Sequence, residues 1–469
     1  MLIILSCGMI IPVIIGLQSD TNNWQAFAGS SLITFFIGGG TFMAARTGQT
    51  SLSNREAFLL TTLSWTILPI FASLPFMTSN LNLTFTDAFF EAMSGITTTG
   101  ATVLTNLDNI STSLLVWRGI LQWMGGLGII IMAITILPML KVGGMQMFKV
   151  EGFDTQDKVL PRATQLAAAL MLIFSGLTCI WALLYWVSGM SSIDALVHAM
   201  TTIATGGYSN HDLSIGHYNS LAIELVAALG MLAGSIPFLL YIQALRGRPL
   251  LIWKDTQVKG FLATVVFFIF IMSIFLFSAY DNSIGQSLRF ATFNVISIIT
   301  GTGYTSTDFN AWGGVSSVIF FVLMFVGGCA GSTTCGIKIF RFQILFETIK
   351  IQLRQLLQPH GTFVPYFNNR PINESIAASV MGFFYLYALT VCLLAIALAF
   401  IGLDFITALS GAASAVSNVG PGLGTTIGPS STYAVLPDSA KWLLSIGMLL
   451  GRLELYTVLV VFLPQFWRS

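Results

Sequence analysis

The chain has 469 residues, of which 55% are hydrophobic and only 8% are charged, and its formal net charge is +1. Soluble proteins carry roughly 25% charged residues, so this composition excludes an ordinary soluble domain and predicts an all-α polytopic membrane protein. The small net charge gives no indication of a nucleic-acid partner, and at ~20 residues per span the length suits about ten spans with their loops.

The chain begins with two apolar runs, residues 2–17 and 24–45, separated by a short polar stretch. The first run lacks the basic start and the small-residue cleavage site of a secretory signal peptide. We therefore expect residues 1–46 to form a retained N-terminal transmembrane hairpin of two helices.

The rest of the chain divides into four pseudo-symmetric repeats, each predicted to contain a long helix, a short half-helix, a glycine turn and a second helix. The half-helices are too short to span a bilayer, and three of them start at an acid (Asp87, Asp194 or Asp404), where the helix dipole favours negative charge. The predicted pore repeats are residues 47–141, 142–248, 249–358 and 359–469. The predicted helical segments are 57–77, 87–97, 114–140, 163–188, 192–203, 219–245, 260–280, 286–299, a run from 314, 337–357, 375–401, 404–416 and 440–465.

The four turns share a small residue directly before a glycine, and we take Gly100, Gly206, Gly303 and Gly420 as their equivalent positions. A cation sheds its water only where backbone carbonyls replace it, and glycine permits the backbone conformations that this requires. Small residues also ease helix packing in membranes, but four copies in register favour an ion path. The predicted filter residues are Thr98, Thr99, Gly100, Thr205, Gly206, Gly207, Thr302, Gly303, Tyr304, Asn418, Val419 and Gly420.

Basic residues are distributed very unequally between the two sides of the membrane in this predicted topology. All lysines and arginines except Arg118, Arg289, Lys441 and Arg452 fall on one predicted side. By the positive-inside bias that side is cytoplasmic, so both termini lie inside and the four turns open outward. Arg118 is expected to snorkel or pair at the outer interface, and acidic residues toward the outer mouth would concentrate cations there.

A glycine-rich break interrupts the second helix of the third repeat at residues 327–336. A helix does not continue through it easily, because each glycine costs roughly 1 kcal/mol relative to alanine. In this topology the break lies below the turns, where a loop could obstruct or open an ion path. The alternative is a kink that only improves packing. The predicted gate residues within it are Gly327, Gly328, Gly331, Ser332, Thr333, Thr334, Cys335 and Gly336.

Arg452 lies inside the last apolar run, where a buried charge is expensive and is usually paired or functional. Glu454 is two residues away and so faces another side of a helix. The expected partners of Arg452 are therefore the carbonyls of the 327–336 loop, which adds this arginine to the predicted gate. The alternative is a structural arginine with no part in gating.

The ordered set of motifs resembles the Trk/Ktr/HKT superfamily of potassium uptake proteins, and within it the TrkH/TrkG membrane subunits. The resemblance spans nearly the whole chain, including the N-terminal hairpin. The residues that carry it are Thr-Thr-Thr-Gly-Ala (97–101), Ala-Thr-Gly-Gly-Tyr-Ser (204–209), Gly-Thr-Gly-Tyr (301–304) with Asp308 and Trp312, Asn-Val-Gly-Pro-Gly (418–422), Gly-Ser-Thr-Thr-Cys-Gly-Ile-Lys (331–338) and Gly-Arg-Leu-Glu (451–454).

The resemblance implies one pseudo-fourfold potassium pore per subunit of a homodimer in the bacterial inner membrane. It implies that glycine in all four turns favours potassium over sodium, and that the 327–336 loop with Arg452 forms the gate. The transported ion would be K⁺, the chain would carry no cofactor, and NAD(H) or ATP would bind a TrkA-like cytosolic regulator. One departure is Cys335, where the family commonly has glycine, since cysteine restricts φ more than glycine does.

A proton- or sodium-coupled potassium symporter is the alternative function. Coupled carriers usually need titratable groups within the membrane, and apart from Arg452 and Glu454 the predicted spans hold few. Glu224 and Glu347 lie near predicted helix ends. This scarcity favours a channel-like pore.

Other residue types give little indication of further chemistry. No nucleophile–base constellation points to an enzyme. The five cysteines include no CxxC pair and are interpreted as small buried residues. His211 and His217 share a loop and are interpreted as surface residues, not metal ligands.

Overall fold

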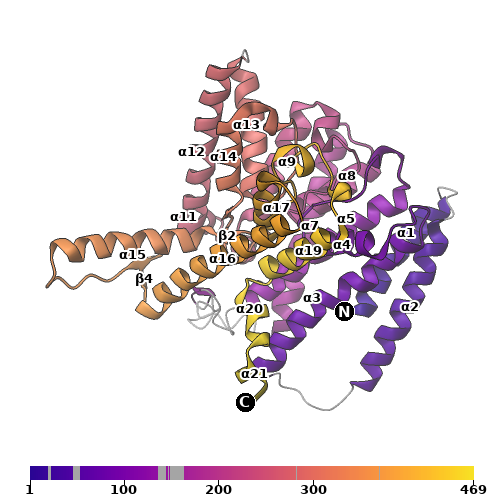
Figure 1. Cartoon of the computed structure of the whole chain (residues 1–469), viewed down its shortest axis with the longest axis horizontal. Coiled ribbons are helices and arrows are strands. Elements are labelled where there is room, and N and C mark those ends of the chain that lie inside the picture. Colours follow the sequence, from indigo (N-terminus) through magenta and orange to yellow (C-terminus); the bar gives the residue numbers. More distant parts are fainter. Residues whose placement is uncertain are drawn as a thin grey trace.

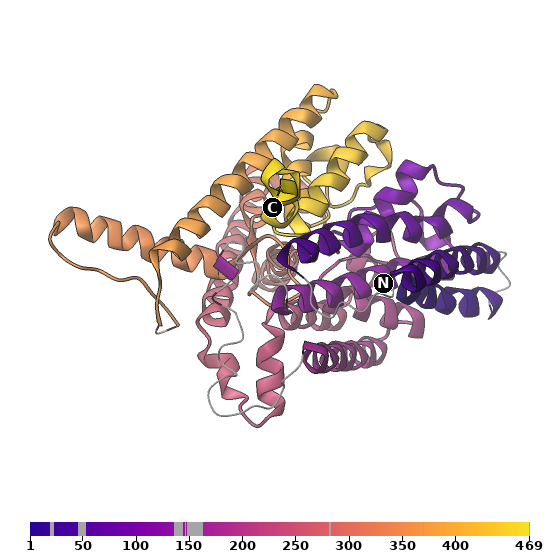
Figure 2. The same cartoon turned by 90° about the horizontal axis from the view of Figure 1, so that it is seen from below.

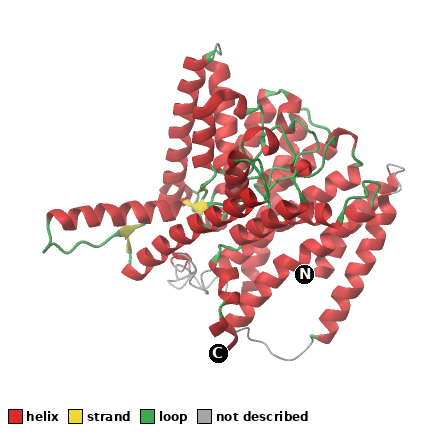
Figure 3. Ribbon diagram, viewed as in Figure 1, coloured by secondary structure: helices red, strands yellow, loops and turns green. Residues whose placement is uncertain are grey.

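The computed structural model describes residues 1–18, 23–45, 53–135, 144–145, 147, 163–280, 283–368 and 370–468. Helices dominate this part of the chain (Figure 3), which contains only two short strand pairs. Among the described residues, six helices are long and apolar enough to cross a membrane. Two further pairs of helices are long and apolar enough if each bent pair is taken as one span. The all-α polytopic class is confirmed. Most of the basic connection predicted at 141–162 lies outside the described residues.

The N-terminal hairpin consists of α1 (Leu2–Gln18) and α2 (Asn23–Ala44), which pack against each other at the edge of the bundle (Figure 1). The buried Asn23 attaches it to the first repeat, because its Nδ2 donates to Ser111 Oγ (2.7 Å) and its Oδ1 accepts from the Asn80 backbone N–H (3.0 Å). The predicted two-helix hairpin is therefore present.

The remaining elements follow the predicted order of helix, half-helix, turn and second helix, although the repeat boundaries themselves stay predictions. The half-helices are α4, α8, α13 and α17. The bounds in chain order are α3 (Asn54–Thr78), α4 (Phe85–Ile96), η1 (Leu107–Asn109), α5 (Thr112–Thr135), α7 (Ala163–Val187), α8 (Ser192–Ile203), η4 (Ser214–Tyr218), α9 (Leu221–Ser235), α10 (Phe238–Leu245), α11 (Leu250–Lys254), α12 (Thr256–Ala279), α13 (Ile284–Ile299), η5 (Phe309–Trp312), α14 (Gly313–Leu323), β1 (Val326–Gly327), β2 (Ile337–Lys338), α15 (Ile339–Leu357), β3 (Tyr366–Phe367), β4 (Arg370–Pro371), α16 (Glu374–Phe400), α17 (Phe405–Ser417), α18 (Gly424–Ile427), η6 (Tyr433–Val435), α19 (Asp438–Arg452), α20 (Tyr456–Leu459), η7 (Val460–Phe462) and α21 (Pro464–Arg468).

Each half-helix begins with a side-chain cap. An oxygen of the N-cap residue accepts the backbone N–H three residues later, and Ser283 forms a full capping box with Gln286. A cap of this kind typically stabilises a helix by about 0.5–2 kcal/mol. The N-cap residues are Thr84, Ser191, Ser283 and Asp404.

Two predicted second helices are not continuous. The segment predicted at 219–245 bends by 93° between α9 and α10, because Pro237 lacks an N–H and disfavours helical backbone at Ile236. The segment predicted at 440–465 bends by 105° after α19, where Glu454 (φ 57°) and Leu455 (φ 47°) have left-handed backbone. Both predictions were wrong, and the second break carries no proline or glycine that could have signalled it.

The third repeat is broken as predicted, between α14 and α15. The break is closed by a parallel bridge in which β1 pairs with β2, and Gly327 is opposite Lys338. Beyond it, α15 projects away from the bundle in both views (Figures 1 and 2), followed by the antiparallel β3–β4 pair.

Candidate ion pathway

The four predicted turns have one backbone conformation in common. Each contains two residues with positive φ, separated by a single residue whose φ is not positive. Side chains adopt this left-handed region at a cost of roughly 1–2 kcal/mol, so glycine suits it best. The pairs are Thr98 (52°) and Gly100 (85°), Thr205 (49°) and Gly207 (77°), Gly301 (69°) and Gly303 (79°), and Asn418 (52°) and Gly420 (105°).

The glycine at the second positive-φ position of each turn faces a backbone carbonyl of the next turn. The contacts run from the first turn to the second, third and fourth, and back to the first, so the turns close a ring. No Cβ fits at these glycines without displacing backbone. A Cβ built on each would lie 2.3 Å (Gly100 to Gly206 O), 1.8 Å (Gly207 to Thr302 O), 2.1 Å (Gly303 to Val419 O) and 2.7 Å (Gly420 to Thr99 O) from that oxygen.

This ring corrects the sequence alignment by one residue in the second turn. Gly207, not Gly206, has the left-handed φ and the contact with the next turn. A Cβ on Gly206 would instead meet the side chain of Gln122, at 2.4 Å from its Cδ. Two adjacent glycines had made the register ambiguous, and only the conformation resolves it.

Several carbonyls of the ring are available to a cation. Among the described residues, no protein group donates a hydrogen bond to the carbonyl oxygens of Thr99, Thr302 and Val419. The equivalent oxygen of Gly206 differs, because Gln122 Nε2 donates to it at 2.6 Å. Buried carbonyls without a donor are unusual and suit a desolvated cation.

The half-helices end at the ring. The C-terminal residues of α4, α8, α13 and α17 are buried and lead directly into the positive-φ residues. A helix C-terminus carries the equivalent of about half a negative charge. Four such ends at the ring favour a cation over an anion.

The 327–336 loop lies directly below the ring. Cys335 Sγ is 3.9 Å from Thr98 Oγ1, and Thr205 Oγ1 donates to Thr333 Oγ1 at 3.1 Å. The Thr333 backbone N–H donates to the Gly234 carbonyl (3.1 Å), which fixes the loop to α9. The loop is buried and densely hydrogen-bonded in this conformation.

Arg452 binds the same loop from the end of α19. Its Nη1 donates to the Thr333 carbonyl (3.2 Å) and contacts Cys335 Sγ, and its Nη2 reaches the Gly125 carbonyl (3.4 Å). The predicted pairing of Arg452 with loop carbonyls is confirmed. Glu454 lies beyond the helix end and pairs with Arg341 of α15 instead.

Cys335 itself causes no backbone strain. Within the loop, only Gly331 (φ 75°) and Gly336 (φ 70°) have positive φ. Cys335, where the family that the sequence resembles commonly has glycine, therefore adopts a backbone that any residue accepts.

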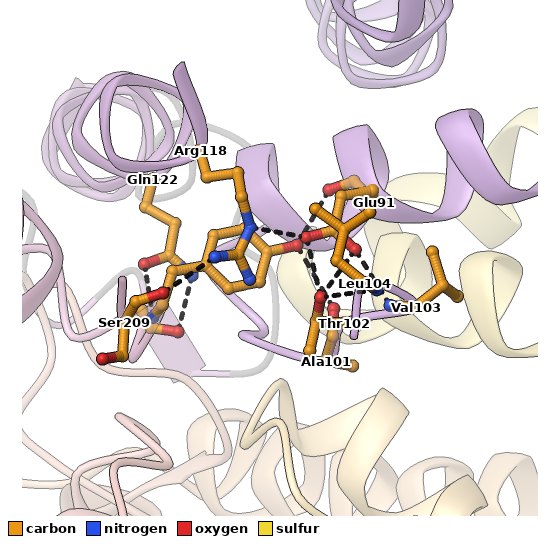
Figure 4. A network of polar contacts seen from close by, with 10 residues as sticks. Glu91, Ala101, Thr102, Val103, Leu104, Arg118, Gln122 and Ser209 are labelled. Atoms are coloured by element: carbon orange, nitrogen blue, oxygen red, sulfur yellow. Dashed lines mark hydrogen bonds and ion pairs between the residues drawn. The ribbon is translucent and has the colours of Figure 1, made fainter. Parts of the chain in front are cut away.

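A buried ion pair supports the first two turns from behind (Figure 4). Arg118 Nε donates to Glu91 Oε1 (2.8 Å), and Arg118 Nη1 donates to the Ser209 carbonyl (2.8 Å). Glu91 also accepts from Thr102 Oγ1 (3.0 Å) and from the Val103 N–H (3.0 Å). Arg118 is only 1% exposed, so the prediction that it snorkels was wrong, while the prediction of a partner was right.

We predict that Glu91→Gln lowers the thermal unfolding midpoint of the purified protein. The change leaves Arg118 buried without its counter-charge, and removing one partner of a buried pair costs about 3–5 kcal/mol. The matched control is Glu347→Gln, which removes the exposed pair with Lys350; such pairs contribute about 0–1 kcal/mol. Equal midpoints for the two variants would contradict a structural role of the buried pair.

A family model described as "TrkH: Cation transport protein" matches residues 23–469 of the chain. The chain belongs to the TrkH family. The Trk system potassium uptake protein TrkI of Halomonas elongata is 46% identical over 468 residues, which cover 100% of this chain and 95% of that protein. TrkH of Escherichia coli K12 is 37% identical over 476 residues, which cover 100% of this chain and 98% of that protein.

The fold agrees with a solved member of the TrkH family. The crystal structure of the potassium transporter TrkH from Vibrio parahaemolyticus superposes with a TM-score of 0.92 at 34% identity. The match covers 100% of this chain and 97% of that chain. The predicted family and fold class are therefore confirmed.

One cavity opens at the ring of this TrkH-family chain, and a smaller one lies at the 327–336 loop. The outer one has a volume of about 120 Å³ and is lined by Gly100, Gly207, Gly303 and Gly420, the four glycines that the conformation aligns. The inner one measures only about 20 Å³ and is lined by residues of the 327–336 loop together with Arg452.

Some residues have roles that the sequence did not reveal. Tyr304 was predicted as a filter residue, but Ser297 Oγ donates to its carbonyl (2.6 Å) and its hydroxyl lies 2.5 Å from Thr201 Oγ1. The sequence analysis did not single out Gln122 or Glu91 as residues that support the turns. Each is a polar residue in an apolar helix, and that pattern could have indicated a functional or structural role.

The cysteines and Glu224 also differ from expectation. Cys7, Cys179 and Cys392 are exposed on the protein surface, and only Cys329 and Cys335 are buried. Glu224 does lie near a helix end as predicted, in the first turn of α9, but it is buried and pairs with Arg289 (2.7 Å).

The loop that follows the second turn carries a histidine, His211, whose charge is stabilised by acids. His211 Nε2 is 3.6 Å from Asp194 Oδ2, and His211 Nδ1 is 2.5 Å from Asp108 Oδ1. These carboxylates, Asp194 first, raise the pKa of His211 above its usual range. In return, the bond to His211 lowers the pKa of Asp108.

Proposed function

We propose that the chain is the membrane subunit of a Trk-type potassium uptake system and conducts K⁺ through the ring. The proposal is supported by the names of the relatives that match the whole chain, all Trk potassium uptake proteins. The single observation that carries it is the closed ring of four glycine turns facing the carbonyls of their neighbours. In this function the carbonyls replace the water of a cation as it enters.

The same geometry supports a preference for potassium. The four glycines of the ring leave the carbonyls as the groups nearest the ion path, with no side chain to compete for the cation. The half-helix ends then stabilise the dehydrated ion below the ring.

The 327–336 loop is the proposed gate. It closes the route directly below the ring, and Arg452 holds it through Thr333 and Cys335. A positive charge at this position also repels cations. Opening requires the loop and Arg452 to separate, and we propose that a cytosolic TrkA-like regulator that binds NAD(H) or ATP drives this movement in a homodimer, with both termini of the chain cytoplasmic.

A proton- or sodium-coupled symporter is the second candidate, and the buried acids Glu91 and Glu224 are the observation that favours it. Each is bound to an arginine, Arg118 or Arg289, at 2.7–2.8 Å. Both acids are therefore engaged in ion pairs with fixed positive charges, which disfavours a role for them in binding a coupling ion.

Ion flux in proteoliposomes tests both candidates. We expect K⁺ and Rb⁺ to flow down their own gradients much faster than Na⁺ or Li⁺, with no requirement for a proton gradient. Empty liposomes from the same preparation are the control. Flux that needs a proton or sodium gradient would replace the channel-like function by the symporter.

A further inference from the structure

Three metal-ligating side chains from the outer loops of two repeats converge above the ring. Asp108 lies in η1 after the first turn, and His211 and His217 lie in the loop after the second. Their ligand atoms all lie within 4.8 Å of one another. The imidazole rings of His211 and His217 stack with centroids 3.7 Å apart and planes 6° from parallel.

The backbone around these residues is fixed. The Leu107 N–H donates to Asp212 Oδ1 (3.1 Å), which ties the two loops together. The Gly216 N–H donates to the Thr305 carbonyl (3.1 Å), which anchors η4 to the third repeat. These two bonds hold together the loops that carry the three side chains.

The two ring nitrogens of His211 are oriented as in a metal-binding histidine. A ligating histidine usually presents its other ring nitrogen to a carboxylate, which fixes the orientation of the ring. His211 Nδ1 faces Asp108, while its buried Nε2 makes no hydrogen bond among the described residues and faces Asp194 Oδ2 at 3.6 Å. His217 is exposed, so its ring can turn toward the position between Asp108 and His211 that a metal ion would occupy.

We propose that Asp108, His211 and His217 form an external binding site for a divalent cation of the zinc class. Two imidazoles and one carboxylate are a donor set that Zn²⁺ accepts, with water in the fourth position. The acids Asp108, Asp194 and Asp212 give the site the negative charge that such a cation favours.

Bound zinc lowers potassium entry. His211 lines the same outer cavity as the four ring glycines. A doubly charged ion at its side opposes the approach of K⁺ through electrostatic repulsion. This consequence rests on the proposed function, whereas binding of the metal does not.

The first experiment measures binding of Zn²⁺ alone to the purified full-length chain by equilibrium dialysis, at mildly alkaline pH where imidazoles are unprotonated. We expect one zinc ion per chain. The affinity should be at least about tenfold lower in His217→Ala, since losing even a residue that hydrogen-bonds to a ligand weakens metal sites about 10–100-fold. His360→Ala, at an exposed position far along the chain, is the matched control. Unchanged affinity in His217→Ala, or weakening in both variants, overturns the site.

The second experiment measures Rb⁺ flux into proteoliposomes with Zn²⁺ added outside. Wild type and His360→Ala are expected to lose flux as zinc binds, while His217→Ala keeps it. Binding without inhibition retains the site and overturns its effect on the pore. Absence of Rb⁺ flux without zinc is a failure of the proposed function, and the dialysis result then decides the metal site by itself.

Discussion

Gly207→Ala is expected to abolish discrimination between K⁺ and Na⁺, or to abolish flux altogether. Residue 207 has φ 77°, where alanine is strained by roughly 1–2 kcal/mol. Its Cβ would also lie 1.8 Å from the Thr302 carbonyl oxygen, which belongs to backbone and cannot rotate away. Since 1.4 kcal/mol corresponds to a factor of ten, we expect the K⁺/Na⁺ flux ratio in proteoliposomes to fall at least about tenfold.

The neighbouring glycine provides the control. Gly206→Ala places its Cβ against the Gln122 side chain, where φ is not positive and the obstacle is a side chain with rotatable bonds. We expect a smaller loss of discrimination in this variant. If Gly206→Ala were the more damaging change, the alignment of the second turn with the other three would be incorrect.

Arg452→Gln is expected to raise potassium flux through the chain in the absence of any regulator. Glutamine removes the charge and the reach to the Thr333 carbonyl and to Gly125, so the 327–336 loop loses its attachment to α19. Hydrogen bonds to charged groups contribute about 1.5–3 kcal/mol each, which predicts an increase of tenfold or more in Rb⁺ flux into proteoliposomes.

Arg289→Gln is the matched variant, because Arg289 is bound to Glu224 in the second and third repeats and does not contact the loop. Its flux is expected to remain that of the wild type. An Arg452→Gln protein that binds Rb⁺ but does not conduct it would show that the arginine is structural. An equal rise of Rb⁺ flux in both variants would show the same.

The broad architecture was accessible from sequence because it depends on local signals. Apolar runs of ~20 residues predict spans, and Asp87, Asp194 and Asp404 marked the starts of three half-helices within three residues. The break at 327–336 was evident from its glycines. These features need no knowledge of which segments meet in space.

The features that were missed depend on contacts between distant segments. The left-handed residues Glu454 and Leu455 end α19 without any helix-breaking residue, and Glu454 lies against Arg341, far away in sequence. The register of Gly206 and Gly207 is likewise decided by the neighbouring turn. Asp108 and His217 are separated by a whole repeat, so no local pattern joins them.

The ion pair between Glu91 and Arg118 has a consequence for how the protein is made. Glu91 lies on α4, Arg118 on α5, and Arg118 also needs the Ser209 carbonyl of the following repeat. During synthesis α5 must enter the bilayer before that carbonyl exists, and an arginine facing lipid is expensive. The first repeat is therefore incomplete until the second has been translated, so a ribosome stalled between them would leave an insertion intermediate exposed to quality-control proteases.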